Sequence, residues 1–330
     1  MRRRDFITLI GGTAATWPSA VWAQRTDRMR TVSMLLSLAE KDPEAINRVK
    51  AFRLGMRDLG WIEGRNVEIE YRFAGTDLES INRNVAEAVR LAPDVIVAQS
   101  TAVMVALQPA TSTIPIVFAV VSDPVSQGFI SNLARPGGNI TGFSFIESDM
   151  VGKWVDLLGD VKPNLSRVAL MFNPDFVPFF DVYLRSFKAL SQQTSVEVEA
   201  VHVRSVADVE LAVAKLGREP GSGLIAAADA FILAVREVIL KAADQHQVPV
   251  ISPYRQFVIE GGLMSYGPDS TDIWRRSASY IDRILKGEPP GNLPVQAPVK
   301  YELVVNLKTA KALGLSPRES FLQLADEVIE

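Results

Sequence analysis

Two carboxylates in this sequence stand where a chain can hold a cationic group of a small molecule. Asp123 follows the apolar run 115–120, and Asp229 follows the apolar run 223–227. A carboxylate at the end of a buried strand can pair with an ammonium group. Each also has an ordinary structural role, because Asp-Pro often opens a turn and aspartate often caps a helix. The binding role and the structural role therefore both stay open.

Hydroxyl groups follow the same kind of strand. Ser100 and Thr101 come after the apolar run 95–98 and begin a predicted helix, and Ser122 comes after the next strand. A hydroxyl and the free backbone N–H groups at a helix N-terminus can hold a carboxylate. The alternative is a plain N-cap, a common role of serine and threonine. For Ser100 and Thr101 both roles, carboxylate binding and helix capping, stay open.

The remaining candidates are an amide and several aromatic rings in the second half of the chain. Aromatic walls with a few polar groups are how pockets for small solutes are built. A tyrosine can both stack on a ligand and offer its hydroxyl. The phenylalanines have a simpler alternative, since they can pack beneath the helix that they begin. These candidates are Asn173, Phe176, Phe179, Phe180, Tyr254 and Tyr266.

Catalytic chemistry lacks its usual residues. The chain has no cysteine and two histidines, His202 and His246, which lie far apart and in no metal-binding motif. No GxSxG or SxxK signature and no nucleophile and base pair stands out. The glycine-rich stretch 135–142 lacks the phosphate-binding pattern and predicts a turn. We expect no enzyme, no catalytic residue, no metal site and no cofactor.

The elements that position the candidates alternate between short β-branched runs and amphipathic helical stretches. This alternation is typical of βαβ units around parallel sheets. Four strands and three helices are expected before residue 121, and the pattern repeats after the loop 135–139. A single core rarely grows beyond about 250–300 residues. The sequence therefore predicts two similar α/β lobes.

The sequence also predicts how three helices begin and which face one of them buries. The helix 43–59 follows the potential cap Asp42. The second helix, which ends near residue 91, should begin with a capping box between Thr76 and Glu79, as a later one should with Ser205 and Asp208. The apolar stripe expected on the helix 43–59 is made of Ile46, Val49, Phe52, Met56 and Leu59.

The first residues form an export signal. Three arginines precede an apolar run that is too short to span a bilayer, and small residues near Ala23 fit a signal peptidase site. We expect a signal peptide over 1–23 that is cleaved near Ala23, and a mature protein in the periplasm. Arg3-Arg4-Asp5-Phe6-Ile7 resembles a twin-arginine signal, while an ordinary secretory signal remains the alternative. The formal net charge of −3 and the missing basic patch argue against a nucleic-acid partner.

Several motifs, taken together and in order, resemble one family. Over essentially the whole mature chain, the sequence is similar to the ABC transporter substrate-binding proteins that include tryptophan- and tyrosine-type receptors. The motifs that carry the resemblance are Gln99-Ser100-Thr101, the run 113–118, Asp123-Pro124-Val125, the stretches 134–142 and 261–267, Pro294-Val295, the run 305–314 and the ending 325–329.

The resemblance implies a type I periplasmic binding protein fold, in which two Rossmann-like lobes with parallel sheets are joined by a three-segment hinge. It places 30–145 and 262–288 in the N-terminal lobe, and 146–261 and 289–330 in the C-terminal lobe. The implied role is to bind a small solute between the lobes and hand it to ABC permease subunits in the inner membrane. We expect a monomer, because such a receptor docks reversibly.

The ligand and the partner stay open at this point. An amino acid or related carboxylate fits the candidate side chains, but a nucleobase, a sugar or an aromatic acid also remains. A periplasmic sensing module that presents its ligand to a chemoreceptor or sensor kinase would have the same fold. A repressor of this fold would need a helix-turn-helix where the signal peptide lies. An α/β enzyme, such as a sugar isomerase, would reveal itself by turnover of the solute.

Overall fold

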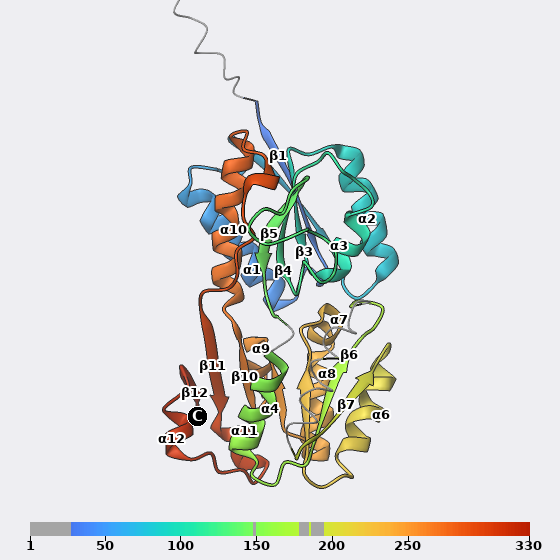
Figure 1. The fold of residues 1–330 in the computed structure, drawn as a ribbon, viewed down its shortest axis with the longest axis vertical. Helices are drawn as coiled ribbons and strands as arrows, with labels where there is room; N and C mark the ends of the chain where they lie inside the picture. The colour runs from blue at the N-terminus through green and yellow to red at the C-terminus, as the bar shows by residue number, and fades with distance from the viewer. Residues whose placement is uncertain (1–27, 148–149, 178–184, 186–194) are drawn as a thin grey trace, which may run out of the picture.

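The structure, a computed structural model, describes residues 28–147, 150–177, 185 and 195–330. Two α/β lobes lie end to end, and the strands of the upper lobe point toward the lower one (Figure 1). The predicted two-lobed α/β fold is confirmed. The predicted signal peptide over 1–23 and the rings of Phe179 and Phe180 lie outside the described residues.

The first lobe is built on a five-stranded parallel sheet in the order β2-β1-β3-β4-β5. Helices α1 and α10 pack together on one face, and α2 and α3 pack together on the other (Figure 1). The elements are β1 (Arg30–Leu36), α1 (Pro43–Asp58), β2 (Val67–Phe73), α2 (Leu78–Leu91), β3 (Val95–Gln99), α3 (Thr101–Leu107), β4 (Ile116–Val121), β5 (Ile140–Ser144) and α10 (Ser270–Leu285).

The second lobe contains a seven-stranded sheet in the order β12-β11-β10-β9-β8-β6-β7, in which only β10 and β11 pair antiparallel. Its elements are α4 (Met150–Val161), β6 (Arg167–Phe172), β7 (Glu197–His202), α6 (Val206–Leu216), β8 (Ser222–Ala226), α7 (Ala230–Ala234), α8 (Arg236–His246), β9 (Val250–Ser252), α9 (Arg255–Ile259), β10 (Met264–Pro268), β11 (Tyr301–Asn306), α11 (Leu307–Ala312), α12 (Glu319–Leu322) and β12 (Glu327–Ile329). The short helix η1 (Pro290–Asn292) lies beside the first sheet.

Three segments join the lobes, but two crossings fall at other residues than expected. Residues 262–288 were expected in the first lobe, yet β10 pairs with β9 and β11 in the second, so the chain crosses near Asp269. Residues 289–330 were expected in the second lobe, yet Gln296 bonds to β5 through its backbone, so the last crossing lies between 296 and 301. The cause is strand pairing, a tertiary contact that sequence periodicity does not specify.

Helix α1 buries only part of the expected apolar stripe. Phe52 and Met56 are buried and Val49 is partly buried, but Ile46 and Leu59 are exposed, whereas Arg48 is only 1% exposed. Gly55 permits the close approach of α10, because a Cβ there would lie 2.3 Å from the carbonyl oxygen of Arg275. The stripe prediction was therefore partly wrong, since helix packing selected a face that carries a charge.

The helix caps were only partly as expected. The expected Thr76 box is replaced by an Asp77 cap, whose carboxylate accepts from two backbone N–H groups of α2. The box of Ser205 and Asp208 is present at the start of α6. Asp42 caps α1, as predicted, by accepting from the backbone N–H of Glu44 at 2.8 Å. The caps thus fix where α1, α2 and α6 begin.

Candidate functional site

Backbone strain collects at the edge of the first sheet that faces the second lobe. Ser100, Val120 and Asp123 have φ angles of +78°, +59° and +45°. The other two described non-glycine residues with positive φ, Ala92 and Gln247, end helices, where this conformation is common. Val120 interrupts the register between β4 and β5, and a β-branched residue there is a true outlier. Such strain is typical of ligand sites.

Ser100 belongs to a buried hydrogen-bonded network. Its hydroxyl shares a hydrogen bond with the Ser37 hydroxyl at 2.8 Å, and it makes no capping bond to α3. The Ser37 backbone N–H and hydroxyl both donate to the Gln99 side-chain oxygen, at 2.9 and 3.0 Å. The plain N-cap reading of the Ser100 side chain is therefore wrong. The network instead fixes the ends of β1 and β3 relative to each other.

Asp123 places a carboxylate oxygen without a partner at the same edge. Its Oδ2 is buried and has no hydrogen bond within the part of the chain that the structure describes, and the same holds for the Gln127 side-chain oxygen. The Gln127 amide donates to the backbone oxygen of Ser122 and, at 3.4 Å, to the Thr101 hydroxyl. The backbone N–H of Asp123 donates to Ile146. Four of the predicted residues thus lie together.

Asp229 in the second lobe has both oxygens occupied. Oδ2 accepts from the backbone N–H of Asn173 at 2.6 Å, and Oδ1 accepts from that of Phe231 at 2.7 Å. Burial raises the pKa of Asp229 to about 7, although these backbone donors lower it. Asp229 therefore caps α7 and ties it to the end of β6. Its role toward an ammonium group stays a prediction.

Two aromatic rings meet between the lobes. Tyr254, at the end of β9, stacks on Phe145 of the segment after β5, with ring centroids 5.3 Å apart and planes at 17°. Phe176 packs against Phe231 at 6.0 Å. Burial raises the pKa of the Tyr254 hydroxyl, which keeps it protonated. The ligand contacts of Tyr254 and Phe176 stay predictions, and the partner of Tyr254, Phe145, was not anticipated.

Tyr266 lies in the hinge strand β10 rather than with these rings. It stacks on Tyr301 with centroids 6.0 Å apart, and the Lys153 ammonium lies 6.0 Å from its ring centroid. Its backbone oxygen accepts from the indole N–H of Trp154 at 2.8 Å. These contacts anchor α4 to the hinge, so Tyr266 has a structural role here, and its ligand contact stays a prediction.

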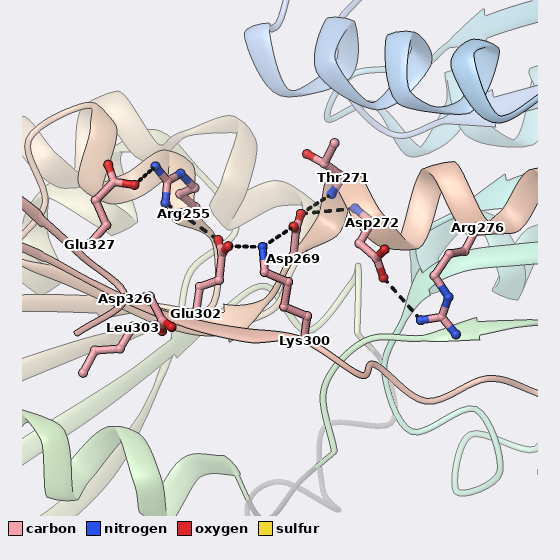
Figure 2. A network of polar contacts seen from close by, with 10 residues as sticks. All are labelled: Arg255, Asp269, Thr271, Asp272, Arg276, Lys300, Glu302, Leu303, Asp326 and Glu327. Atoms are coloured by element: carbon pink, nitrogen blue, oxygen red, sulfur yellow. Dashed lines mark hydrogen bonds and ion pairs between the residues drawn. The ribbon is translucent and has the colours of Figure 1, made fainter. Parts of the chain in front are cut away.

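A polar network holds the two hinge strands together (Figure 2). The backbone N–H of Asp269 donates to the Lys300 carbonyl, and the Lys300 ammonium pairs with Asp269 at 3.1 Å and with Glu302 at 2.5 Å. Asp269 also caps α10, and Arg255 links Glu302 to Glu327 of β12. The crossings are therefore tied to a helix of one lobe and a sheet of the other.

One buried ion pair joins the lobes directly. Arg236 of α8, 3% exposed, binds both oxygens of Glu260 through Nε at 2.9 Å. Its Nη1 donates to Asp42 Oδ2 in the first lobe at 2.8 Å and to the Leu233 carbonyl. Because Asp42 caps α1 with its other oxygen, both halves of this pair are already ordered within their own lobes.

Sequence reasoning missed the charged and aromatic residues that meet across the lobes: Arg48, Arg236 and Phe145. Arg48 carried a usable signal, since it falls in helical register with the buried Ala45 and Phe52. Arg236 and Phe145 carried none, because their partners come from distant parts of the chain. Among the described residues there is no cluster of metal-ligating side chains and no helix long and apolar enough to cross a membrane.

Comparison with known proteins gives consistent matches. The sequence model of the family described as ABC transporter substrate binding protein matches residues 39–329. A tyrosine-binding protein of Clostridioides difficile is 25% identical over 292 residues, which cover 88% of this chain and 84% of that protein. A crystal structure of a conserved domain protein from Vibrio cholerae is 27% identical, with a TM-score of 0.83 over 91% of this chain and 100% of that one.

A structure of an ABC domain from Streptococcus pneumonia, in complex with L-Trp, is 23% identical. Its TM-score is also 0.83, and the match covers 92% of this chain and 100% of that one. At this identity the likeness concerns the fold, which both chains share from end to end.

Proposed function

Because the chain belongs to the ABC transporter substrate-binding protein family, whose members bind solutes and are not enzymes, we infer that it is the receptor of an importer. It is exported to the periplasm, binds one small solute between its lobes, and delivers the solute to ABC permease subunits in the inner membrane. The ligand is an amino acid or a related carboxylate.

The observation that carries this proposal is the pairing of strained and unpartnered polar groups with aromatic rings at the interlobe edge. Ser100, Val120 and Asp123 keep costly backbone conformations there, and Asp123 Oδ2 lacks a partner within the described residues. Strain of this kind persists only where surrounding structure holds it, and it gathers at ligand sites. The stacked pair of Phe145 and Tyr254 supplies an apolar surface beside them.

The amino-acid assignment draws on two relatives. One is named a tyrosine-binding protein, and the other was solved in complex with L-Trp. Tyrosine and tryptophan are aromatic amino acids. Each needs a cationic partner for its carboxylate, an anionic partner for its ammonium group and a flat apolar surface for its ring. The unpartnered Asp123 oxygen can serve as the anionic partner of the ammonium group, and the rings of Phe145 and Tyr254 can supply the apolar surface.

Closure about the hinge is the mechanism. A solute that contacts both lobes shifts the population toward the closed form by its differential affinity for that form. The buried pair between Arg236 and Asp42 forms only when the lobes meet, so it adds to the stability of the closed form. The permease then recognises the closed receptor, and no bond of the solute is made or broken.

A thermal-shift screen of the purified mature protein tests the proposal. A solute at 100 times its dissociation constant stabilises the folded form by about 2.7 kcal/mol. We expect such a shift for one or more amino acids or related carboxylates, with the compound recovered unchanged by mass spectrometry. No shift across amino acids, organic acids, sugars and nucleobases would overturn the proposal, as would catalytic consumption of a compound.

A further inference from the structure

Arg48 is a buried cation with most of its donors unused. The side chain is 1% exposed, and its Nε donates to Glu44 Oε1 at 2.9 Å. The same Glu44 oxygen also accepts from the Ser270 hydroxyl at 2.8 Å. Neither Nη1 nor Nη2 of Arg48 has a hydrogen-bond partner in the described ranges of the chain. The guanidinium therefore keeps its two outer nitrogens available in a site closed to water.

Such an arrangement is costly unless an anion completes it. Removing a cation from water carries a large free-energy penalty, which an ion pair offsets only when the remaining donors are also satisfied. One bond to Glu44 leaves that condition unmet. The fork of a guanidinium matches the two oxygens of a carboxylate, which accepts two parallel hydrogen bonds from it. A carboxylate is the group that the unused nitrogens of Arg48 would take.

The second lobe covers this guanidinium. Its Cζ lies 5.9 Å from the ring centroid of Tyr254, which stacks on Phe145. Arg48 belongs to the first lobe and Tyr254 to the second, so closure removes Arg48 from water. Closed lobes without an anion therefore bury two guanidinium nitrogens that have no acceptor in the described part of the chain, although Glu44 balances the charge, whereas open lobes leave these nitrogens hydrated.

We propose that Arg48 recognises the carboxylate of the ligand, and that hydrogen bonding of its two outer nitrogens couples recognition of the ligand to closure of the lobes. This inference rests on the proposed function. It is an alternative to the expectation that Ser100 and Thr101 hold the carboxylate, and the Ser100 hydroxyl is already bonded to Ser37.

Asp123 completes the recognition by supplying the opposite charge. Its backbone N–H donates to the carbonyl of Ile146, the residue after Phe145, and Arg48 lies over the ring of Tyr254, which stacks on Phe145. Asp123 Oδ2 is buried and has no partner among the described residues. A ligand with one anionic and one cationic group beside a flat apolar part satisfies both side chains. The site therefore selects a zwitterion over a molecule with a single charge.

The test compares L-tyrosine and L-tryptophan with analogues that lack one charge. Tyramine and tryptamine lack the carboxylate, and 3-(4-hydroxyphenyl)propanoate and indole-3-propanoate lack the ammonium group. Calorimetry measures each against the wild type, Arg48→Met and Asp123→Asn. Methionine keeps length without charge, and asparagine tolerates the positive φ of position 123.

We expect the wild type to prefer a zwitterion to both of its analogues. Arg48→Met should bind it about 10- to 150-fold more weakly, the range of one hydrogen bond to a charged group, and should lose the preference over the amine. Asp123→Asn should instead lose the preference over the acid. Without ligand, Arg48→Met should melt at a lower temperature, because it leaves the largely buried Glu44 without its ion-pair partner, so each titration is run below the melting temperature of the variant.

Arg72→Met is the matched control. Arg72 is also largely buried, but it pairs with Glu70 and with Glu87 at 2.7 Å on an edge strand of the first lobe. This variant should keep the affinity and the preference of the wild type. If it weakens binding as much as Arg48→Met does, or if Arg48→Met retains the preference for the zwitterion over the amine, the proposed role of Arg48 is refuted.

Two further outcomes separate this inference from the proposed function. If the wild type binds D-glucose, myo-inositol or uracil and no carboxylate, the chain is a solute receptor and the role of Arg48 is wrong. If it binds none of these compounds and no member of the wider panel, both proposals fail.

Discussion

Asp42→Asn should weaken ligand binding without harming the fold. The Asp42 Oδ2 atom accepts from Arg236 Nη1 across the lobes at 2.8 Å, with side-chain exposures of 10% and 3%. Its Oδ1 caps α1, and asparagine caps a helix as well as aspartate does. The substitution therefore removes the interlobe ion pair while it keeps the cap.

The magnitude follows from the partners that Arg236 retains. Losing both carboxylates would cost about 3–5 kcal/mol, the penalty for a buried charge that loses its pair. Arg236 keeps Glu260 and the Leu233 carbonyl, so the loss is that of one charged hydrogen bond, about 1.5–3 kcal/mol. Only the closed form loses it. Ligand affinity should then fall about 10- to 150-fold, because the closed form must be populated from a less favourable equilibrium.

Calorimetric titration with the best ligand of the thermal screen measures the effect. Asp77→Asn is the matched control, since Asp77 caps α2 in the same way and is not engaged across the lobes. The control should bind as the wild type does, and both variants should unfold at similar denaturant concentrations. Equal affinities of Asp42→Asn and the wild type would refute the assignment of this ion pair to the closed form.

Three further substitutions test the packing, the buried acid and the hinge. Gly55→Ala should lower the free energy of unfolding by about 1–3 kcal/mol in urea, because its Cβ would meet the Arg275 carbonyl at 2.3 Å. Gly159→Ala in α4, with no atom within 4 Å of the added Cβ, should raise it by up to about 1 kcal/mol, and the opposite order would contradict the packing of α1 on α10. The raised pKa of Asp229, about 7 against 3.8, means that the folded form holds the proton more tightly, so the free energy of unfolding should fall by at most about 4 kcal/mol as the pH rises from 4 to 7. Asp229→Asn should remove that slope in urea titrations at several pH values, and an unchanged slope would assign it to other groups. Lys300→Ala should change the free energy of unfolding by less than about 1 kcal/mol, since its side chain is 57% exposed, and a larger loss would mean that ion pairs rather than the backbone bond to Asp269 hold the hinge strands.

Sequence periodicity predicted the elements well and their partners less well. Alternating strands and helices predicted both lobes. The strand β10 was expected in the first lobe. Its apolar residues indicate that it is buried, but they do not indicate which strand it pairs with. The prediction of the buried face of α1 was partly wrong for a related reason. A stripe through Ile46 and Leu59 looks apolar, yet α10 packs on the face that contains Gly55.

The site was predictable where position along a strand decides it. Asp123 and Tyr254 follow strand ends, and both lie at the interlobe edge because parallel strands end together. Asp229 also follows a strand, but the neighbouring backbone N–H groups occupy both of its oxygens. Arg48 could have been found from its helical register with Ala45 and Phe52, whereas Arg236 contacts a residue of the other lobe that helical position does not reveal.

Small-angle X-ray scattering of the mature protein, with and without a saturating ligand, tests the central claim that two lobes close around a solute. We predict a smaller radius of gyration with ligand, and a ligand-bound profile that matches the structure in which Arg236 reaches Asp42. A saturating ligand that leaves the scattering of an open ligand-free protein unchanged would contradict closure.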